Sequence, residues 1–138
     1  MKCLVDLNIL LDVVLDRQPW VEDARKFLDE AADRTVELCI SAVTVTTLFY
    51  LTERLADSRR AFASVDRACS DFTVIAVGLR QLTAARVMPG PDFEDNVQIA
   101  CAVEVDASFI VSRDISGFQH SPIQCLDAAT ALSRIISP

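Results

Sequence analysis

Two aspartates stand directly after short apolar segments, and they are the first residues in the chain that suggest chemistry. Asp6 follows residues 3–5 and Asp114 closely follows residues 108–112, and both segments are runs typical of buried β-strands. Each aspartate also has a purely structural alternative. Asp6 could begin a turn into a helix, with Asn8 as the helix N-cap, and Asp114 could open a loop.

A further group of acids opens a later apolar helix. Asp92, Glu94 and Asp95 all lie where acids favour a helix N-terminus through capping and the helix dipole. Helical periodicity places Ile99 and Ala102 on the face of Asp95, which predicts that Asp95 points inward. Asp92 is then the expected cap, and Glu94 is expected to point elsewhere.

Carboxylates gathered at one site indicate a divalent metal. Burying them unpaired costs several kcal/mol, and a hard cation such as Mg²⁺ or Mn²⁺ removes that cost. Mg²⁺ keeps water and phosphate oxygens among its ligands, so the reaction class that follows is phosphodiester hydrolysis. We therefore predict a metal-dependent catalytic site formed by Asp6, Asp95 and Asp114.

Alternating strands and helices must position these acids. The apolar runs predict strands at residues 3–5, 36–40, 72–76, 108–112 and 123–126. Helices are expected at about residues 9–15, 19–32, 43–55, 59–70, 79–87 and 93–105, and after Asp127. The strands are solidly apolar, which is typical of a parallel sheet covered on both faces. The prediction is a single α/β domain over residues 1–138, with three α/β/α layers and a central, mainly parallel sheet of four to five strands. Sites in such sheets form outside the carboxyl ends of the strands.

Composition narrows the class of protein. The 138 residues, 51% of them hydrophobic, fit one domain, and the net charge of −7 argues against a surface built broadly for nucleic acid. An acidic metal site would itself contribute to that charge. The five cysteines have no metal-ligand spacing and suit a reduced core, and the lone His120 indicates neither a zinc site nor a catalytic triad. With no recognisable signal peptide or membrane span, a cytoplasmic protein without a membrane partner is expected.

The order of these segments resembles the PIN-domain nucleases. Residues 4–12 resemble the family's opening motif, an Asp followed two places on by a Thr, Ser or Asn. Residues 40–44 resemble its second strand and helix start, residues 92–100 its third motif, and residues 110–118 its fourth. The match covers nearly the whole chain in order, and the length is that of VapC-type toxins of bacterial toxin–antitoxin pairs.

The resemblance implies a function and a set of residues. Asp6, Asp95 and Asp114 fall on the family's metal-binding acids, and Asn8 falls on the polar residue that supports the first of them. The family's acids bind Mg²⁺ or Mn²⁺ for endoribonucleolytic cleavage of RNA. Toxin members pair with an antitoxin, often as homodimers, so a cognate antitoxin and a second copy of the chain are the expected partners.

The chain departs from the family at one acid. The family usually places a Glu in the helix after the second strand, where this chain has Thr47, and the nearest acid, Glu53, comes almost two turns later. Candidate substitutes are Asp92 and Asp12, which lies one turn past Asn8, although a solvated helix acid is the commoner role for a residue such as Asp12. With one acid fewer, the site would bind its metal more weakly or bind a single ion.

Two other functions fit parts of the sequence. A PIN-like fold that lacks catalysis could bind RNA or protein, and the missing Glu favours that alternative. A phosphoacceptor receiver domain also carries aspartates at strand ends, but it requires paired acids after the first strand and a late Lys. Here Leu7 follows Asp6, and the only lysines are Lys2 and Lys26.

Arginines near an expected turn are candidates for contacts with RNA or with a partner. Arg54, Arg59, Arg60 and Arg67 fall close together there, where they could meet phosphate groups or an acidic antitoxin segment, or form an ordinary solvated turn. Arg59, Arg60 and Arg113 are the candidate substrate-binding residues. Three aromatic residues flank the turn and could form a dimer surface or pack in the core: Phe49, Tyr50 and Phe62.

Overall fold

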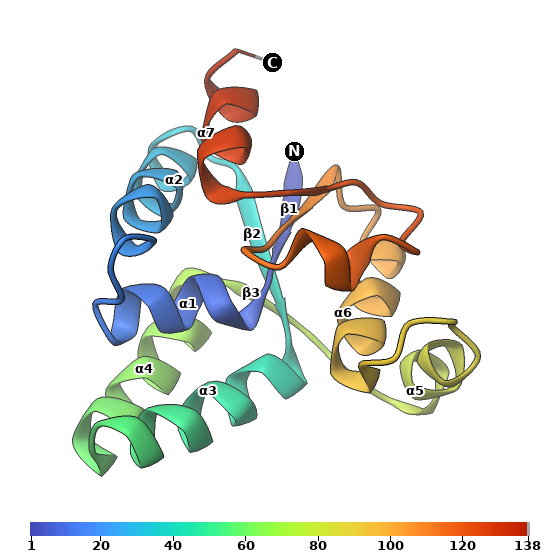
Figure 1. Ribbon diagram of the computed structural model, residues 1–138, viewed down its shortest axis with the longest axis horizontal. Coiled ribbons are helices and arrows are strands. Elements are labelled where there is room, and N and C mark those ends of the chain that lie inside the picture. The colour runs from blue at the N-terminus through green and yellow to red at the C-terminus, as the bar shows by residue number, and fades with distance from the viewer. Residues whose placement is uncertain (138) are drawn as a thin grey trace.

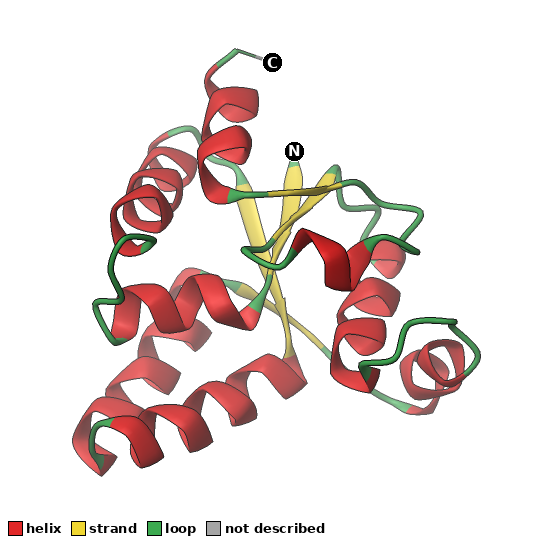
Figure 2. Cartoon of the chain, viewed as in Figure 1, coloured by secondary structure: helices red, strands yellow, loops and turns green. Residues whose placement is uncertain are grey.

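A five-stranded parallel sheet forms the centre of the molecule (Figures 1 and 2). The computed structural model describes residues 1–137. The strand order is β3-β2-β1-β4-β5, and every neighbouring pair is parallel. The strands are β1 (Lys2–Val5), β2 (Glu37–Ser41), β3 (Thr73–Ile75), β4 (Phe109–Val111) and β5 (Cys125–Leu126). The expected α/β fold with a parallel sheet of up to five strands is confirmed.

Helices cover both faces of this sheet, which gives the three expected layers (Figure 1). One face carries α1 (Leu7–Val14), α2 (Val21–Asp33), α3 (Ala42–Leu55), α4 (Ser58–Asp71) and α7 (Ala128–Ile136). The other carries α5 (Leu79–Arg86), α6 (Phe93–Glu104) and a short 3-10 turn, η1 (Ile115–Phe118). No helix among residues 1–137 combines the length and the apolar character that a bilayer crossing requires.

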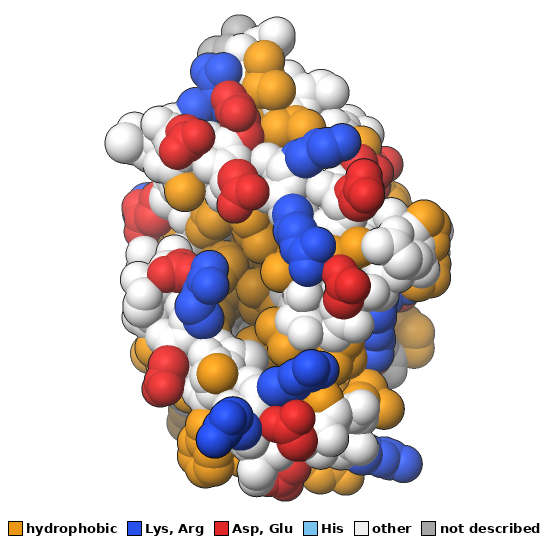
Figure 3. Space-filling view, turned by 90° about the vertical axis from the view of Figure 1, so that its left-hand side faces the viewer, with side chains coloured by type: hydrophobic (Ala, Val, Ile, Leu, Met, Phe, Trp, Pro, Cys, Tyr) orange, Lys and Arg blue, Asp and Glu red, His pale blue; other side chains and the backbone are white. Residues whose placement is uncertain are grey.

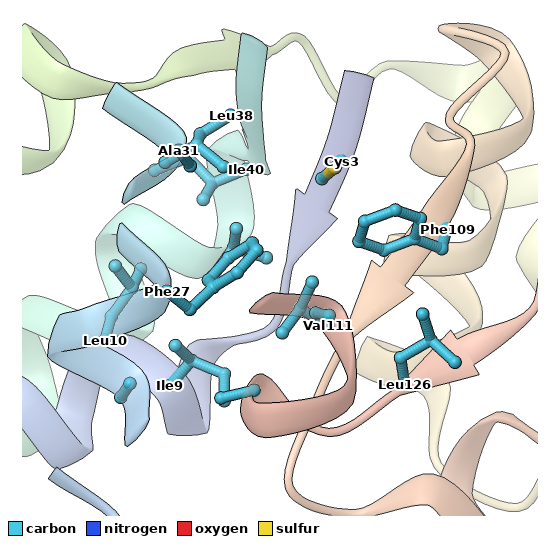
Figure 4. Packing of buried hydrophobic residues seen from close by; sticks show 14 of the residues in the cluster. Cys3, Ile9, Leu10, Phe27, Ala31, Leu38, Ile40, Phe109, Val111 and Leu126 are labelled. Carbon is cyan, nitrogen blue, oxygen red and sulfur yellow. The ribbon is translucent and has the colours of Figure 1, made fainter. Parts of the chain in front are cut away.

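The strands alternate between two hydrophobic cores, one on each face of the sheet. Cys3 and Val5 of β1 point into the core beneath α1 and α2, while Leu4 points into the core beneath α6. Figure 4 shows the first of these cores, where Phe27 of α2 packs beside Ile40 of β2. Because each large apolar side chain buried in this way contributes roughly 1.5–3 kcal/mol, the sheet is a firm base for residues at its edge.

The carboxyl ends of β1 and β4 lie at the point where the chain reverses its direction across the sheet. From β1 the chain passes to β2 on one side, and it later returns to place β4 on the other side of β1. The segments that leave β1 and β4 therefore diverge at this edge, which is the usual position of a site in an open α/β sheet. Asp6 directly follows β1, and Asp114 lies in the segment that follows β4.

Asp92 caps α6 as expected, but Asn8 does not cap α1. α1 begins at Leu7, so Asp6 and not Asn8 stands at the N-cap position, and the Asp6 side chain makes no capping hydrogen bond. Its carboxylate is held instead by side chains from the residue that follows β4 and from α6, as described below. The caps that do accept a backbone N–H through their side chains are Ser41, Asp57, Asp92 and Asp127.

Candidate metal centre

Asp6 is held in one orientation at the end of β1. Its side chain is buried, with Asp6 only 4% exposed. Its Oδ2 accepts a hydrogen bond from Ser112 Oγ at 2.6 Å, and its Oδ1 accepts one from Gln98 Nε2 at 2.9 Å. Burial raises the pKa of Asp6, and these hydrogen bonds act against that rise. The carboxylate is therefore fixed by long-range contacts that a simple turn into α1 would not need.

Asp95 lies beside Asp6, joined to it through one amide. Gln98 Nε2, which donates to Asp6, is also 3.5 Å from Oδ1 of Asp95. Burial, followed by the charges of neighbouring acids led by Asp6, raises the pKa of Asp95 to about 7. The inward orientation expected for Asp95 is therefore found, and its carboxylate lies in the field of several others.

Asp114 completes the group from the segment after β4. Its Oδ1 accepts hydrogen bonds from Ser116 Oγ at 2.6 Å and from the Gly117 N–H at 3.3 Å, which hold the turn into η1. Its Oδ2 faces Asp95: a Cβ added to Gly117 would lie 3.1 Å from Oδ2 of Asp114 and 2.8 Å from Oδ2 of Asp95. The two carboxylate oxygens thus converge on one point that only a glycine at 117 leaves open. Asp114 therefore opens the turn and also faces the site.

Asn8 and Ser112 tie the start of α1 to the end of β4. Asn8 Nδ2 donates to Ser112 Oγ at 3.3 Å, and Asn8 Oδ1 accepts the Arg113 N–H at 3.2 Å. Ser112 Oγ in turn accepts the Asp114 N–H at 3.0 Å. Asn8 thus sets the position of the residues around Asp6 without capping a helix.

Asp12 is neither solvated nor part of the carboxylate group. It is fully buried at 0% exposure, and both of its oxygens are bound by Arg113: Nε to Oδ2 at 3.0 Å and Nη2 to Oδ1 at 3.1 Å. The Arg113 guanidinium also lies 4.0 Å from the centre of the Trp20 ring. Arg113 is therefore engaged within the protein, where it clamps the segment between Ser112 and Asp114 to α1.

Thr47 and Glu94 meet across the gap between α3 and α6. Thr47 Oγ1 donates to Glu94 Oε2 at 3.3 Å. The expectation that Glu94 points elsewhere was wrong, because its carboxylate accepts a hydrogen bond from Thr47 on α3. Burial, followed by the charges of Asp92 and Asp6, raises the pKa of Glu94. Asp92 instead caps α6 through Oδ1, which accepts the Asp95 N–H at 3.0 Å.

The structure does not bring Arg59 and Arg60 to the acids. Both lie in the first turn of α4, at the far end of the α3–α4 hairpin from the start of α3 (Figure 1). Arg60 is exposed there, and its Nε lies 3.8 Å from Oδ2 of Asp57. Any contact of these arginines with RNA would have to lie away from the carboxylates.

The chemistry of the donors fits a hard divalent cation. Every side chain that could bind a metal here would do so through oxygen, the ligand atom that Mg²⁺ and Mn²⁺ prefer. No Lys, Arg or His within residues 1–137 forms an ion pair with these acids, which are Asp6, Glu94, Asp95 and Asp114. Gln98, which is 1% exposed, leaves its Oε1 buried without a hydrogen-bond partner. In the described part of the chain no three acids stand at the spacing of a finished metal site, and the Gln98 amide lies between Asp6 and Asp95 instead.

Sequence reasoning missed four residues of this centre: Ser112, Gln98, Glu94 and Gly117. Gln98 carried a usable signal, because it is a polar residue within the apolar run of α6 and lies three positions after Asp95. Ser112 and Gly117 lie within the segments already singled out, but nothing in their types distinguishes them from ordinary loop residues.

Comparison with known proteins agrees with this architecture. The PIN domain family model matches residues 2–116. No curated protein sequence matches the chain. VapBC2 from Rickettsia felis, solved bound to a DNA fragment from its promoter, superposes with a TM-score of 0.73 at 15% identity, covering 92% of this chain and 98% of that one.

Two further solved structures have the same fold. DNA-bound VapBC from Salmonella typhimurium matches with a TM-score of 0.72 at 19% identity, covering 93% of this chain and 98% of the other. PAE2754 from Pyrobaculum aerophilum matches with a TM-score of 0.67 at 19% identity, covering 100% of this chain and 91% of the other. The family match over most of the sequence and the shared fold lead to one conclusion: the chain belongs to the PIN-domain family.

Proposed function

We propose that this protein is an endoribonuclease that depends on Mg²⁺ or Mn²⁺ and acts as the toxin of a toxin–antitoxin pair. PIN domains are generally nucleases that use divalent metals, which is the family-level support. The observation that carries the proposal is the meeting of Asp6, Asp95 and Asp114 at one sheet edge, from segments far apart in the sequence.

In this proposal, one group of residues binds the metal and a second group fixes the orientation of the metal ligands. Asp6, Asp95 and Asp114 would bind the cation, which when bound supplies a Lewis acid for activating water and stabilising charge on a phosphodiester. Ser112 and Gln98 fix the orientation of Asp6. The Asp12–Arg113 pair fixes the segment that carries Asp114. This shell keeps the acids in place before substrate arrives.

Cleavage of a structured RNA by the purified protein tests the proposal. We expect cleavage with Mg²⁺ or Mn²⁺, none with EDTA, and a loss on the order of a hundredfold or more in D6N and D95N. Folding of each variant is checked by its thermal transition without metal. If RNA is bound but never cleaved, the protein is instead a PIN-like binding module, an alternative that the replacement of a carboxylate by Thr47 in α3 favours.

An apolar groove between α1, α2 and α4 is our candidate surface for the antitoxin. Several solved relatives are toxin–antitoxin complexes, among them one from Klebsiella pneumoniae. Figure 3 shows this face, hollowed and apolar at its centre, with basic and acidic side chains around it. Arg60 and Arg67 lie along the α4 side. The apolar lining includes Leu10, Val14, Leu28, Leu38, Ala63 and Ala68. Because Asp29 and Asp71 also line the groove, an antitoxin segment with apolar residues and flanking charges of both signs would fit it.

Co-expression with a candidate antitoxin, such as the product of a small reading frame found beside the gene, tests this surface. A63E places a charge in the groove at an exposed position, so it should abolish co-purification of the partner. A129E, on the exposed side of α7 and outside the groove, is the matched control. Equal capture by both variants would remove the groove from consideration.

We also propose a homodimer built on the α3–α4 hairpin. Tyr50 is 60% exposed and Phe62 is 62% exposed there, and the Phe62 ring packs edge-on against Phe49 with centroids 4.8 Å apart. Exposed aromatic residues grouped in this way favour association. Light scattering of the wild type and of a Y50S/F62S variant should show a dimer and a monomer, respectively.

A further inference from the structure

We propose that Glu94 is the fourth metal-binding carboxylate of this centre, supplied from α6 across the contact with Thr47. The inference rests on the proposed metal site and adds a ligand to it. In this proposal Glu94 replaces the carboxylate that a Glu at position 47 of α3 would supply.

The first support is the contact itself. Thr47 Oγ1 donates to Glu94 Oε2 at 3.3 Å, so the carboxylate of α6 and the side chain of α3 occupy neighbouring positions at one edge of the site. A hydroxyl can hold a carboxylate oxygen in place but brings no charge of its own. The negative charge at this position therefore comes from Glu94.

The second support is that the other oxygen of Glu94 has no partner. Oε1 is buried and accepts no hydrogen bond within the described residues. A buried carboxylate oxygen left unpaired is costly, so it calls for a positive ligand. Gln98, which is 1% exposed and whose amide faces Asp6 and Asp95, leaves a second buried oxygen unpaired in the same centre. Two buried acceptors without hydrogen-bond partners, both close to carboxylates, are suited to binding a cation.

The other candidate substitutes have different roles: Asp12 forms an ion pair, and Asp92 is an exposed helix cap. Both oxygens of Asp12 are bound by Arg113. Asp92 Oδ1 caps α6 by accepting the N–H of Asp95. Glu94 is thus the one acid near Asp6 and Asp95, in the described chain, whose side chain leaves a buried oxygen free.

Mn²⁺ binding, measured by isothermal titration and by the metal-induced rise in melting temperature, tests the assignment without reference to activity. E94Q keeps the shape and the Thr47 contact but removes the charge, and it should weaken Mn²⁺ binding about tenfold or more. D92N is the matched control, because Asn also caps helices and the variant removes one charge from the same helix end. D92N should change the affinity less than threefold, by screened electrostatics alone.

Moving the carboxylate back across the contact gives a second, independent test. In T47E/E94Q the carboxylate is supplied by residue 47 of α3 in place of residue 94 of α6. Mn²⁺ affinity should then recover to within about threefold of wild type, because the two positions are coupled and one carboxylate substitutes for the other. If E94Q binds Mn²⁺ like wild type while D6N and D95N do not, the assignment of Glu94 is overturned and the proposed metal site stands. If wild type itself binds no Mn²⁺, both are overturned. Equal losses in E94Q and D92N would also overturn the assignment, since charge alone would then explain them.

Discussion

Ser112 Oγ lies 2.6 Å from Oδ2 of Asp6, a hydrogen bond that spans 106 positions of the chain. Ser112 Oγ also accepts a hydrogen bond from the backbone N–H of Asp114 at 3.0 Å. One hydroxyl at the end of β4 therefore orients an aspartate after β1 and the backbone of an aspartate after β4. This contact makes the two strand ends parts of one site.

Replacing Ser112 by Ala should loosen both aspartates. Asp6 would lose a hydrogen bond to its charged form, so Mn²⁺ affinity should fall about tenfold, and the free energy of unfolding should drop by about 1–3 kcal/mol. Titration calorimetry and urea unfolding measure the two effects. S133A, an exposed serine on α7, is the control and should change neither. An S112A protein with wild-type metal affinity would show that this hydroxyl does not position the site.

The buried Asp12–Arg113 pair should matter most when only one partner is removed. R113M leaves the fully buried Asp12 carboxylate unpaired and should lower the free energy of unfolding by about 3–5 kcal/mol. The double variant D12N/R113M should be less destabilised than the sum of the two single variants. R25M breaks the exposed pair with Asp16 and should cost less than about 1 kcal/mol. Additive effects in the double-mutant cycle would contradict the pairing.

Gly117 should be needed for the metal more than for the fold. In G117A the new methyl group would stand 2.8 Å from Oδ2 of Asp95 and 3.1 Å from Oδ2 of Asp114, at the point where these oxygens converge. Carboxylates can rotate aside, so the metal-free melting temperature should change little while Mn²⁺ binding is lost. G78A is the control, because its methyl group would meet its nearest neighbour at an ordinary 3.6 Å. Undiminished Mn²⁺ binding by G117A would argue against a cation at this point.

Asp95 should give the metal-free protein a characteristic pH dependence. Burial and the neighbouring acids raise the pKa of Asp95 from 3.8 to about 7. Because the folded state binds this proton more tightly than the unfolded state, the stability it contributes is complete below the ordinary pKa and is lost as pH rises through the raised one. Relative to D95N, wild type should therefore lose melting temperature as the pH rises from 3.8 to 7.

Saturating Mn²⁺ should cancel that loss, because metal binding displaces the proton and stabilises the ionised carboxylate. The measurement is a set of thermal melts of wild type and D95N across this pH range, each with EDTA and with Mn²⁺. Parallel curves for the two proteins in EDTA would show that Asp95 has an ordinary pKa.

The sequence predicted the sheet and the acids at its edge because both depend on local patterns. Solid apolar runs identified β1 and β4, and the residues after them, Asp6 and Asp114, had to lie at the carboxyl edge. Helical periodicity oriented Asp95 correctly, since Ile99 and Ala102 share its face.

The remaining contacts depend on which elements meet across the site, and periodicity does not report that. Glu94 was assigned to the wrong side because a helix pattern places it relative to its own helix and not relative to Thr47 on α3. The type of Asn8 favours a helix cap, whereas its side chain contacts Ser112 and Arg113 just after β4. Both errors concern polar residues whose partners are distant in the sequence.

Anomalous diffraction from a crystal of the wild-type protein grown with Mn²⁺ tests the central claim most directly. We expect an anomalous peak for a manganese ion bound by carboxylate oxygens of Asp6, Asp95 and Asp114, beside Gly117 and with Glu94 turned toward it. No peak is expected at that position in D95N crystals. A fully ordered site without manganese, or a peak held only by acids elsewhere on the surface, would contradict it.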